Sequence, residues 1–385
     1  NQFSHGFDET AKMTPGCGRE TRARRKAAST LAYAPSHILN TAATCDGAEV
    51  GMAPVGVGVV GCGFMGERVH LPSLRSIPDA EIIAVSDVDE ERARRAAGRF
   101  RAKAYASYSD LIKDPGVEAV IVSVPTFLHA EITIEAARVG KHVLCELPLA
   151  ITLEDVDRVI ETTRRAGVLL LPGSALRYTP NYAKAKELIE AGRIGKPVMA
   201  FFQELVPAQD LAAQWPPGSW AWQKDKAGGP LMTMSIFSVD LLRWLLSSGV
   251  ARVRRAEKIF PLERFGGTLG YNACALLAFE SGAMAAMAFS GSVNPSTGRS
   301  RLEVVGDSGN GLCALGNNSL TLYGEDPWRH EWEFREQGPR VWGHQQQDQH
   351  FIECITQGKK PLVTPEDARK AHEVAMVIAG LAPER

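Results

Sequence analysis

The stretch Val55-Gly56-Val57-Gly58-Val59-Val60-Gly61-Cys62-Gly63-Phe64-Met65-Gly66 decides the fold of this chain. Its first six residues form a continuous apolar run, which is typical of a parallel strand buried on both faces of a sheet. Glycines at Gly-x-Gly-x-x-Gly spacing follow at once, and a helix that includes residues 67–74 is predicted after them. A strand, a glycine turn and a helix in this order predict a loop that binds the pyrophosphate of a dinucleotide.

Each residue of the turn has a predicted role. Gly61 allows the tight turn, Gly63 lets the backbone approach the pyrophosphate, and Gly66 lets helix and strand pack closely. The free N–H groups at the helix start, near Phe64 and Met65, are expected to face the phosphates. The alternative is a structural glycine turn in an α/β domain that binds no nucleotide.

An acidic residue follows at the distance that a dinucleotide site requires. Asp87 lies 21 residues after Gly66, at the end of a strand predicted over residues 81–86. Its carboxylate is expected to accept hydrogen bonds from the adenosine ribose hydroxyls. The segment Asp87-Val88-Asp89 has no arginine nearby to receive a 2′-phosphate. The sequence therefore favours NAD over NADP.

Strands and helices alternate at short spacing up to residue 173. Further helices are predicted over residues 90–100, near Leu111, and over 129–139 and 152–166, and further strands near Tyr105 and over 119–123, 142–145 and 168–171. Parallel strands joined by helices require right-handed crossovers. We therefore expect an α/β fold with a Rossmann doubly wound parallel sheet, forming an NAD(P)-binding domain over residues 54–173.

The pattern changes after residue 173. Following an amphipathic helix over residues 180–191 come longer, alternating strands, predicted over 198–206, 273–279, 283–289, 302–305 and 320–323, with a long apolar segment at 231–246. We expect residues 174–385 to form a C-terminal α/β domain with an open, mostly antiparallel sheet for substrate binding and oligomerisation. Helices over 350–356 and 365–379 are expected to return to the body.

Composition excludes several classes of function. The 43 basic and 44 acidic residues give a net charge of −1, which argues against a nucleic acid partner or an anionic membrane. The seven cysteines show no metal-ligand spacing, so we expect reduced thiols, no metal and a cytoplasmic location. No apolar stretch approaches the roughly 18 residues that span a bilayer.

The first 53 residues lack periodicity and contain the basic cluster Arg22-Ala23-Arg24-Arg25-Lys26. We expect a poorly ordered extension unless it docks on the body. Two interpretations are open. One is a leader or translated upstream sequence with Met52 as the natural start, and the other is a transit peptide.

Several spaced motifs resemble the Gfo/Idh/MocA oxidoreductases from about residue 54 to 379. They are the glycine turn, Val120-Ile121-Val122-Ser123 with Pro125 and His129, Gly140-Lys141-His142-Val143 before Glu146-Leu147-Pro148-Leu149-Ala150, Gly228-Gly229-Pro230-Leu231 before Asp240-Leu241-Leu242-Arg243-Trp244, and Pro361-Leu362-Val363-Thr364-Pro365-Glu366-Asp367. The resemblance implies a small-molecule substrate, commonly a sugar or inositol, and a homodimer or tetramer. It implies NAD or NADP near Ser123, Val124, Pro125, Thr126, His129, Glu146, Leu147 and Arg177.

This chain departs from the family pattern at the groups expected to move protons. The usual Glu-Lys-Pro is Glu146-Leu147-Pro148 here, and Thr233 and Phe237 stand where the family has Asp and His. None of the three replacements can titrate. General acid–base help is worth roughly 10²–10⁴-fold, so ordinary sugar dehydrogenation is expected to be slow. The apolar replacements favour a less polar substrate.

Three residues are candidates for the missing proton transfer: Tyr178, His129 and Lys224. Each also has a structural alternative, as a packed phenol, a backbone-bonded histidine or a solvated lysine. Three functions remain open. They are an NAD(P)-dependent oxidoreductase with an altered acid–base set, a lyase or glycosidase that uses NAD without net redox, and a non-catalytic NAD-binding regulatory or scaffold protein.

Overall fold

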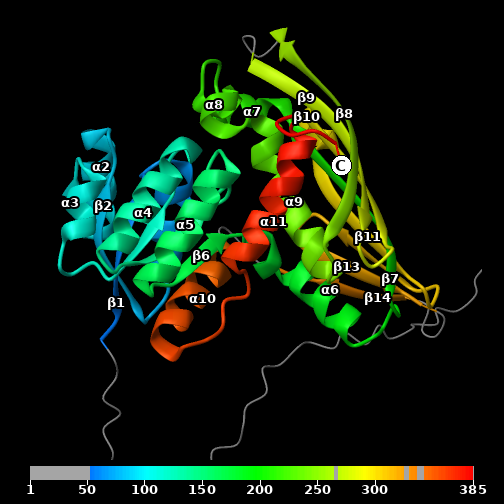
Figure 1. Ribbon diagram of the computed structural model, residues 1–385, viewed down its shortest axis with the longest axis horizontal. Helices are drawn as coiled ribbons and strands as arrows, with labels where there is room; N and C mark the ends of the chain where they lie inside the picture. The colour runs from blue at the N-terminus through cyan, green and yellow to red at the C-terminus, as the bar shows by residue number, and fades with distance from the viewer. Residues whose placement is uncertain (1–52, 264–267, 325–328, 336–341, 385) are drawn as a thin grey trace, which may run out of the picture. The chain divides into compact units, whose positions relative to one another are not determined.

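The computed structural model describes residues 53–263, 268–324, 329–335 and 342–384, and their strands form two sheets (Figure 1). The predicted extension, up to residue 52, lies outside the described residues. No helix in the described ranges is both long and apolar enough to cross a bilayer.

The first sheet is fully parallel, with the order β3-β2-β1-β4-β5-β6. Its strands are β1 (Val55–Val60), β2 (Ala80–Ser86), β3 (Lys103–Tyr105), β4 (Ala119–Val122), β5 (His142–Glu146) and β6 (Leu170–Gly173). All six residues of β1 are buried, as the continuous apolar run predicts. The predicted doubly wound parallel sheet is confirmed.

Helices connect these strands close to the predicted positions. They are η1 (Gly66–His70), α1 (Leu71–Leu74), α2 (Glu90–Phe100), α3 (Tyr108–Lys113), η2 (Thr126–Leu128), α4 (His129–Arg138) and α5 (Leu153–Ala166). Local signals fix their ends, as α5 shows. Thr152 caps its first turn by accepting a hydrogen bond from the backbone N–H of Asp155, and Gly167 ends it with a φ of 67°.

The second sheet has eight strands in the order β14-β13-β12-β11-β7-β10-β9-β8. They are β7 (Pro197–Pro207), β8 (Val250–Leu262), β9 (Thr268–Phe279), β10 (Met284–Val293), β11 (Arg299–Gly306), β12 (Gly311–Leu315), β13 (Ser319–Tyr323) and β14 (Arg329–Glu333). Only the β7–β10 pair is parallel, so the expected open, mostly antiparallel sheet is confirmed. Strands β8, β12 and β14 were not predicted, because charged or small residues interrupt their apolar pattern.

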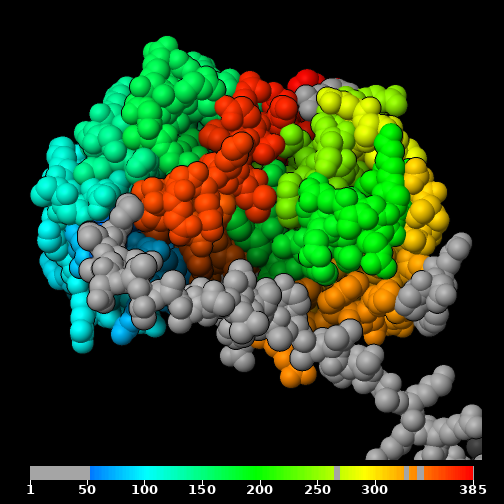
Figure 2. Space-filling model, turned by 90° about the horizontal axis from the view of Figure 1, so that it is seen from below, coloured from blue at the N-terminus to red at the C-terminus, as the bar shows by residue number. Residues whose placement is uncertain are grey.

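The remaining helices cover the second sheet or join it to the first. They are η3 (Ala175–Tyr178), α6 (Pro180–Glu190), α7 (Ala208–Gln214), η4 (Trp220–Trp222), α8 (Lys224–Ala227), α9 (Pro230–Leu245), α10 (His344–Gln357) and α11 (Pro365–Ile378). Helix α11 contacts both α9 and α5, and α10 packs on η1 and α1. Figure 2 shows this C-terminal segment, in orange and red, between the elements of the two sheets.

Helix α10 begins at His344, six residues before the predicted start. The first turn of this helix contains three glutamines, Gln345-Gln346-Gln347. Because glutamine is polar, the hydropathy pattern shows no helical period there. The period is nevertheless present, because Gln347, Asp348 and Phe351 are all buried. The predicted start was wrong because buried polar residues replace apolar ones in this turn.

Candidate cofactor site

Four of the predicted site residues meet at one edge of the first sheet. The strand order reverses at β1, which lies between β2 and β4, and ligands of such sheets bind outside the carboxyl ends at this point. Gly61 follows β1, Asp87 follows β2, Ser123 follows β4, and Glu146 ends β5.

The glycine turn has little room for side chains. Gly61 has a φ of 99°, which favours glycine. A Cβ on Gly66 would lie 1.8 Å from the carbonyl oxygen of Gly61, so only glycine lets η1 start this close to β1. A Cβ on Gly63 would meet nothing within 4 Å. The backbone at Gly63 therefore faces open space, which fits a bound pyrophosphate.

The segment after β4 is tied to this turn. The Ser123 hydroxyl donates to the carbonyl oxygen of Gly61 at 3.1 Å, and its N–H donates to that of Val60 at 2.9 Å. Val124 and Pro125 are half-buried, and Thr126 is buried. On the other side of the turn, Phe64 at the helix start is exposed and Met65 is half-buried.

Asp87 is fixed by the turn that it follows. The backbone N–H of Cys62 donates to Oδ2 of Asp87 at 2.8 Å, and that of Asp89 donates to Oδ1 at 2.9 Å. Arg92, from the first turn of α2, forms an ion pair with the same carboxylate at 3.3 Å. The expectation of no nearby arginine is therefore wrong. Arg92 lies five positions after Asp87, and the first turn of α2 brings its side chain back to the carboxylate. The segment Asp87-Val88-Asp89 alone does not predict this contact.

Glu146 is part of a buried cluster that the sequence did not predict. Its Oε1 accepts a hydrogen bond from Nε2 of His70 at 3.0 Å, and Nδ1 of His70 lies 3.0 and 3.1 Å from the two carboxylate oxygens of Asp348. His70 and Asp348 are fully buried, and Glu146 is 7% exposed. A Cβ on Gly173 would lie 3.0 Å from Oε1 of Glu146, so this glycine leaves room for the carboxylate.

Both ring nitrogens of His70 lie within hydrogen-bond distance of carboxylates, an arrangement that favours the doubly protonated imidazolium. Burial works against this charge, but Asp348 and then Glu146 outweigh it and raise the pKa of His70 to about 10. The ring of His344 packs edge-on against His70, with 5.9 Å between ring centroids. Burial lowers the pKa of His344 to about 4, so that ring is neutral.

The raised pKa of His70 predicts a loss of stability in alkali. An unfolded histidine titrates near 6.5, so this stabilisation is complete below pH 6.5 and declines as the pH rises toward 10. Urea unfolding at pH 6, 8 and 9.5 should show a steady fall in the free energy of unfolding. In Asp348→Asn the fall should be smaller, because the main cause of the raised pKa is gone. An equal fall in both proteins would contradict this assignment.

His129 contacts only backbone acceptors among the described residues. Its Nδ1 lies 2.7 Å from the carbonyl oxygen of Pro148, and its Nε2 lies 2.7 Å from that of Val124. The residue is 2% exposed, and burial lowers its pKa. These contacts correspond to the structural alternative, in which His129 joins the segment after β4 to that after β5.

Arg177 is engaged by protein groups. Its guanidinium makes a two-pronged ion pair with Asp240, with Nε at 2.8 Å and Nη2 at 2.5 Å from the two carboxylate oxygens. Its Nη1 donates to the carbonyl oxygen of Leu362 at 3.0 Å. Arg177 and Asp240 are 3% and 0% exposed, respectively. The pair joins η3 to α9, so Arg177 acts in the packing of these elements.

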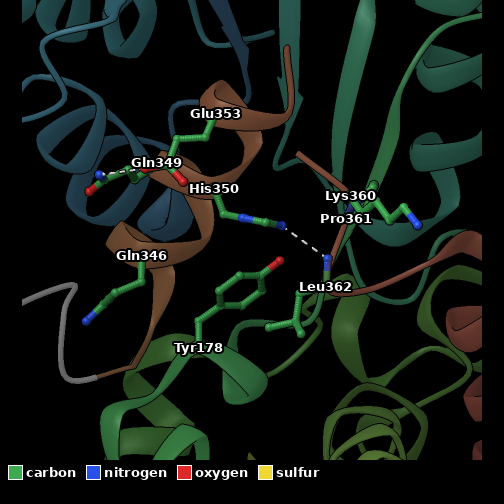
Figure 3. A pocket seen from close by; sticks show the side chains of 8 residues that line it. All are labelled: Tyr178, Gln346, Gln349, His350, Glu353, Lys360, Pro361 and Leu362. Atoms are coloured by element: carbon green, nitrogen blue, oxygen red, sulfur yellow. Dashed lines mark hydrogen bonds between the residues drawn. The ribbon is translucent and has the colours of Figure 1, made fainter. Parts of the chain in front are cut away.

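Tyr178 faces a different cavity, of about 560 Å³, beside α10 (Figure 3). Its lining residues are Tyr178, Gln346, Gln349, His350, Glu353, Lys360, Pro361 and Leu362. The ring of Tyr178 lies 5.6 Å from that of His350, and burial raises the pKa of its phenol. Of this lining, the sequence suggests a role in proton transfer for Tyr178 alone, and Pro361 and Leu362 belong to a motif of the family resemblance.

Lys224 is exposed, and the lysine that reaches the site edge is its neighbour. Nζ of Lys226, also on α8, lies 6.0 Å from the centre of the Phe127 ring, and Phe127 belongs to the segment after β4. Lys226 is half-buried, whereas Lys224 is exposed. Sequence spacing alone could not predict which of these two lysines, two residues apart, lies near the segment after β4.

The residues at the three altered family positions lie in or against the core. Leu147 is 4% exposed, Phe237 packs against the same hydrophobic cluster, and Thr233 makes one long hydrogen bond, at 3.4 Å, to the carbonyl oxygen of Gly229. No group of His, Cys, Asp and Glu that could hold a metal occurs within the described ranges.

Comparison with known proteins identifies the family. Residues 55–174 match a model described as an oxidoreductase family with an NAD-binding Rossmann fold, and residues 186–380 match that family's C-terminal α/β domain.

Individual relatives agree with the family models. Myo-inositol 2-dehydrogenase of Thermotoga maritima is 36% identical over 59% of this chain and 66% of its own length, which is just under two thirds. The scyllo-inositol 2-dehydrogenase (NAD(+)) of Bacillus subtilis is 28% identical over 83% of this chain and 91% of its own. The crystal structure of a probable dehydrogenase from Thermotoga maritima superposes with a TM-score of 0.70 at 30% identity, covering 85% of this chain and 96% of that one. The chain belongs to the Gfo/Idh/MocA family of oxidoreductases.

Proposed function

We propose that this chain is an NAD-dependent oxidoreductase with an altered acid–base set. The observation that carries the proposal is the glycine turn. Gly61 and Gly66 fix it against β1, Gly63 leaves its backbone open, and Asp87 is held beside it by the N–H of Cys62. When bound, NAD would supply hydride transfer. The residues of this chain would bind the pyrophosphate, hold the ribose and orient the ring. Residues 54–173 would bind the cofactor, and residues 174–385 the substrate.

We propose that Asp87 makes the chain prefer NAD over NADP. Its side chain is 6% exposed and oriented by two backbone N–H groups, so a 2′-phosphate would meet a fixed carboxylate. Arg92 is already paired with it. The Bacillus relative, whose name specifies NAD(+), agrees with this preference.

Replacing Asp87 tests this preference. We expect Asp87→Ser to weaken NAD binding by about tenfold, the effect of losing one or two charged hydrogen bonds, and to strengthen NADP binding because Arg92 is released. Calorimetric titration with both cofactors measures the change. In the control Arg92→Ala, Asp87 is retained and NAD should still be preferred. Unchanged selectivity in Asp87→Ser would refute the role of this carboxylate.

The substrate is proposed to be a small molecule with a less polar face than an unmodified sugar. The relatives named above are inositol dehydrogenases, which gives the size class. Leu147 stands where the family has lysine, and Phe237 and Met234 are half-buried on α9. These side chains cannot accept a hydroxyl proton. Lys226, near the segment after β4, replaces Lys224 as our candidate for proton transfer.

The acid–base proposal is tested by restoring the family residues. We expect the triple variant Leu147→Lys, Thr233→Asp, Phe237→His to gain inositol or sugar oxidation by about 10²-fold or more over wild type. NADH formation is followed by absorbance across a panel of inositols and sugars. Equal rates in the wild type would show that the missing groups do not limit the reaction.

The same panel separates the two alternatives. Turnover of substrate without net change in NADH absorbance would indicate a lyase or glycosidase that uses NAD without net redox. Tight NAD binding with no turnover of any substrate would indicate a regulatory or scaffold protein.

We propose that the chain forms a homodimer or tetramer through the outer face of the second sheet. Large apolar side chains there are exposed, among them Phe201, Leu276 and Met284 at 42%, 62% and 52%. A contiguous exposed apolar face of this kind is typical of a subunit interface. Sedimentation of wild type and of Leu276→Glu distinguishes an oligomer from a monomer.

A further inference from the structure

The buried cluster of Glu146, His70 and Asp348 lies where the nicotinamide end of the cofactor would bind. This inference rests on the proposed function. Asp87 marks the adenosine side of the sheet edge, at the end of β2, and the pyrophosphate turn follows β1. The other half of a dinucleotide must then extend over the ends of β4 and β5. Glu146 is the last residue of β5.

Only one oxygen of Glu146 is engaged by His70. Oε1 receives the hydrogen bond from His70, and no described residue donates a hydrogen bond to Oε2. The side chain is 9% exposed. The carboxylate therefore keeps one oxygen without a hydrogen-bond donor from the described residues, at the carboxyl end of β5.

The cluster carries a net negative charge. Two carboxylates, Glu146 and Asp348, share one imidazolium, that of His70, because hydrogen bonds at 3.0 Å engage both ring nitrogens. The neighbouring ring of His344 adds no charge. Leu147, next to Glu146, adds none either. The cluster is fully or almost fully removed from water, so its charge is weakly screened.

We propose that this cluster tunes the redox state of the bound cofactor, its negative charge stabilising the oxidised, cationic nicotinamide over the neutral reduced ring. Hydride transfer to a substrate breaks a C–H bond of the reduced ring and forms one on the substrate carbon. The substrate oxygen would take up a proton through Lys226, our candidate for proton transfer, and the ring would become a cation. A fixed negative charge near the ring would favour this direction. The bound reduced cofactor is therefore a stronger hydride donor than free NADH.

The test compares the affinities of the two redox forms. Calorimetry measures Kd for NAD⁺, NADH and ADP-ribose in wild type, Glu146→Gln and the remote control Glu187→Gln, which removes an exposed carboxylate on α6. Glu146→Gln keeps the shape and an acceptor for His70 but removes one charge. We expect the ratio of Kd(NADH) to Kd(NAD⁺) to fall roughly tenfold, as for a charge about 10 Å away at an effective dielectric constant near 20. Glu187→Gln should leave the ratio unchanged.

A second pair of variants keeps the test independent of folding at Glu146. Leu147→Lys adds a positive charge beside the intact cluster and should lower the ratio in the same direction. Glu146→Asp retains the charge and should keep the wild-type ratio. ADP-ribose lacks the nicotinamide, so its affinity should stay constant throughout.

The outcomes separate the two levels of the proposal. If wild type fails to bind ADP-ribose and NAD⁺, the proposed cofactor site is wrong. If it binds both, but the ratio stays within twofold in Glu146→Gln and in Leu147→Lys, the redox role of the cluster is overturned.

Discussion

Gly66→Ala is expected to abolish NAD binding and to lower the free energy of unfolding by about 3 kcal/mol, the upper part of the range for overpacking a tight site. The added Cβ would lie 1.8 Å from the carbonyl oxygen of Gly61 and 2.9 Å from its carbon. Both are backbone atoms of the residue that directly follows the fully buried strand β1, so neither can move aside easily. Urea unfolding and calorimetric titration with NAD measure the two effects.

Two other glycines provide matched controls for Gly66→Ala. A Cβ on Gly63 meets no atom within 4 Å, so Gly63→Ala should fold with wild-type stability and lose only cofactor affinity. Gly98, in α2, is equally open, and Gly98→Ala should be stabilised by about 0.5–1 kcal/mol and bind NAD normally. Wild-type NAD affinity in Gly66→Ala would contradict the assigned turn, and wild-type affinity in Gly63→Ala would place the pyrophosphate elsewhere.

The sequence predicted the parts of the fold that depend on local pattern. The apolar run of β1, the glycine turn and the acidic residue at the end of β2 are neighbours in sequence, and their order alone indicates a nucleotide-binding edge. Strands β8 and β14 escaped prediction because they alternate charged residues on one face with few apolar residues on the other. Their place in the sheet is decided by pairing with β9 and β13, which a local pattern does not contain.

The candidate site was predictable only where one short segment defines it. His70 and Asp348 are 278 positions apart, and their contact exists because α10 packs on η1. A histidine in a helix and an aspartate among glutamines carry no sign of each other. Arg92 shows the same limit at short range, since the first turn of α2 brings it to Asp87 from beyond the segment Asp87-Val88-Asp89. Charge pairs between different helices and strands depend on how those elements pack. The spacing of residues along the sequence does not predict that packing.

Arg177 is a further residue whose partner could not be predicted from the sequence. The resemblance places it near the site, and η3 does follow β6 at the correct edge of the sheet. Its guanidinium nevertheless turns to Asp240, whose position on α9 could not be related to Arg177 from sequence. The Ser174 hydroxyl also donates to Asp240, at 2.5 Å, so the carboxylate is the centre of a small buried network.

Breaking this network should cost more stability than any surface change. We expect Arg177→Met to lower the free energy of unfolding by about 3–5 kcal/mol, because the buried charge of Asp240 would lose its two-pronged partner and keep only the Ser174 hydroxyl and the more distant charge of Arg243. The double variant Arg177→Met, Asp240→Leu removes both charges and should recover most of the loss, since a buried pair often contributes little net stability. Chemical unfolding of Arg177→Met, Asp240→Leu and the double variant gives the coupling energy. If Arg177→Met unfolds like wild type, or the double variant is no more stable than the single one, the pair is not what holds η3 against α9.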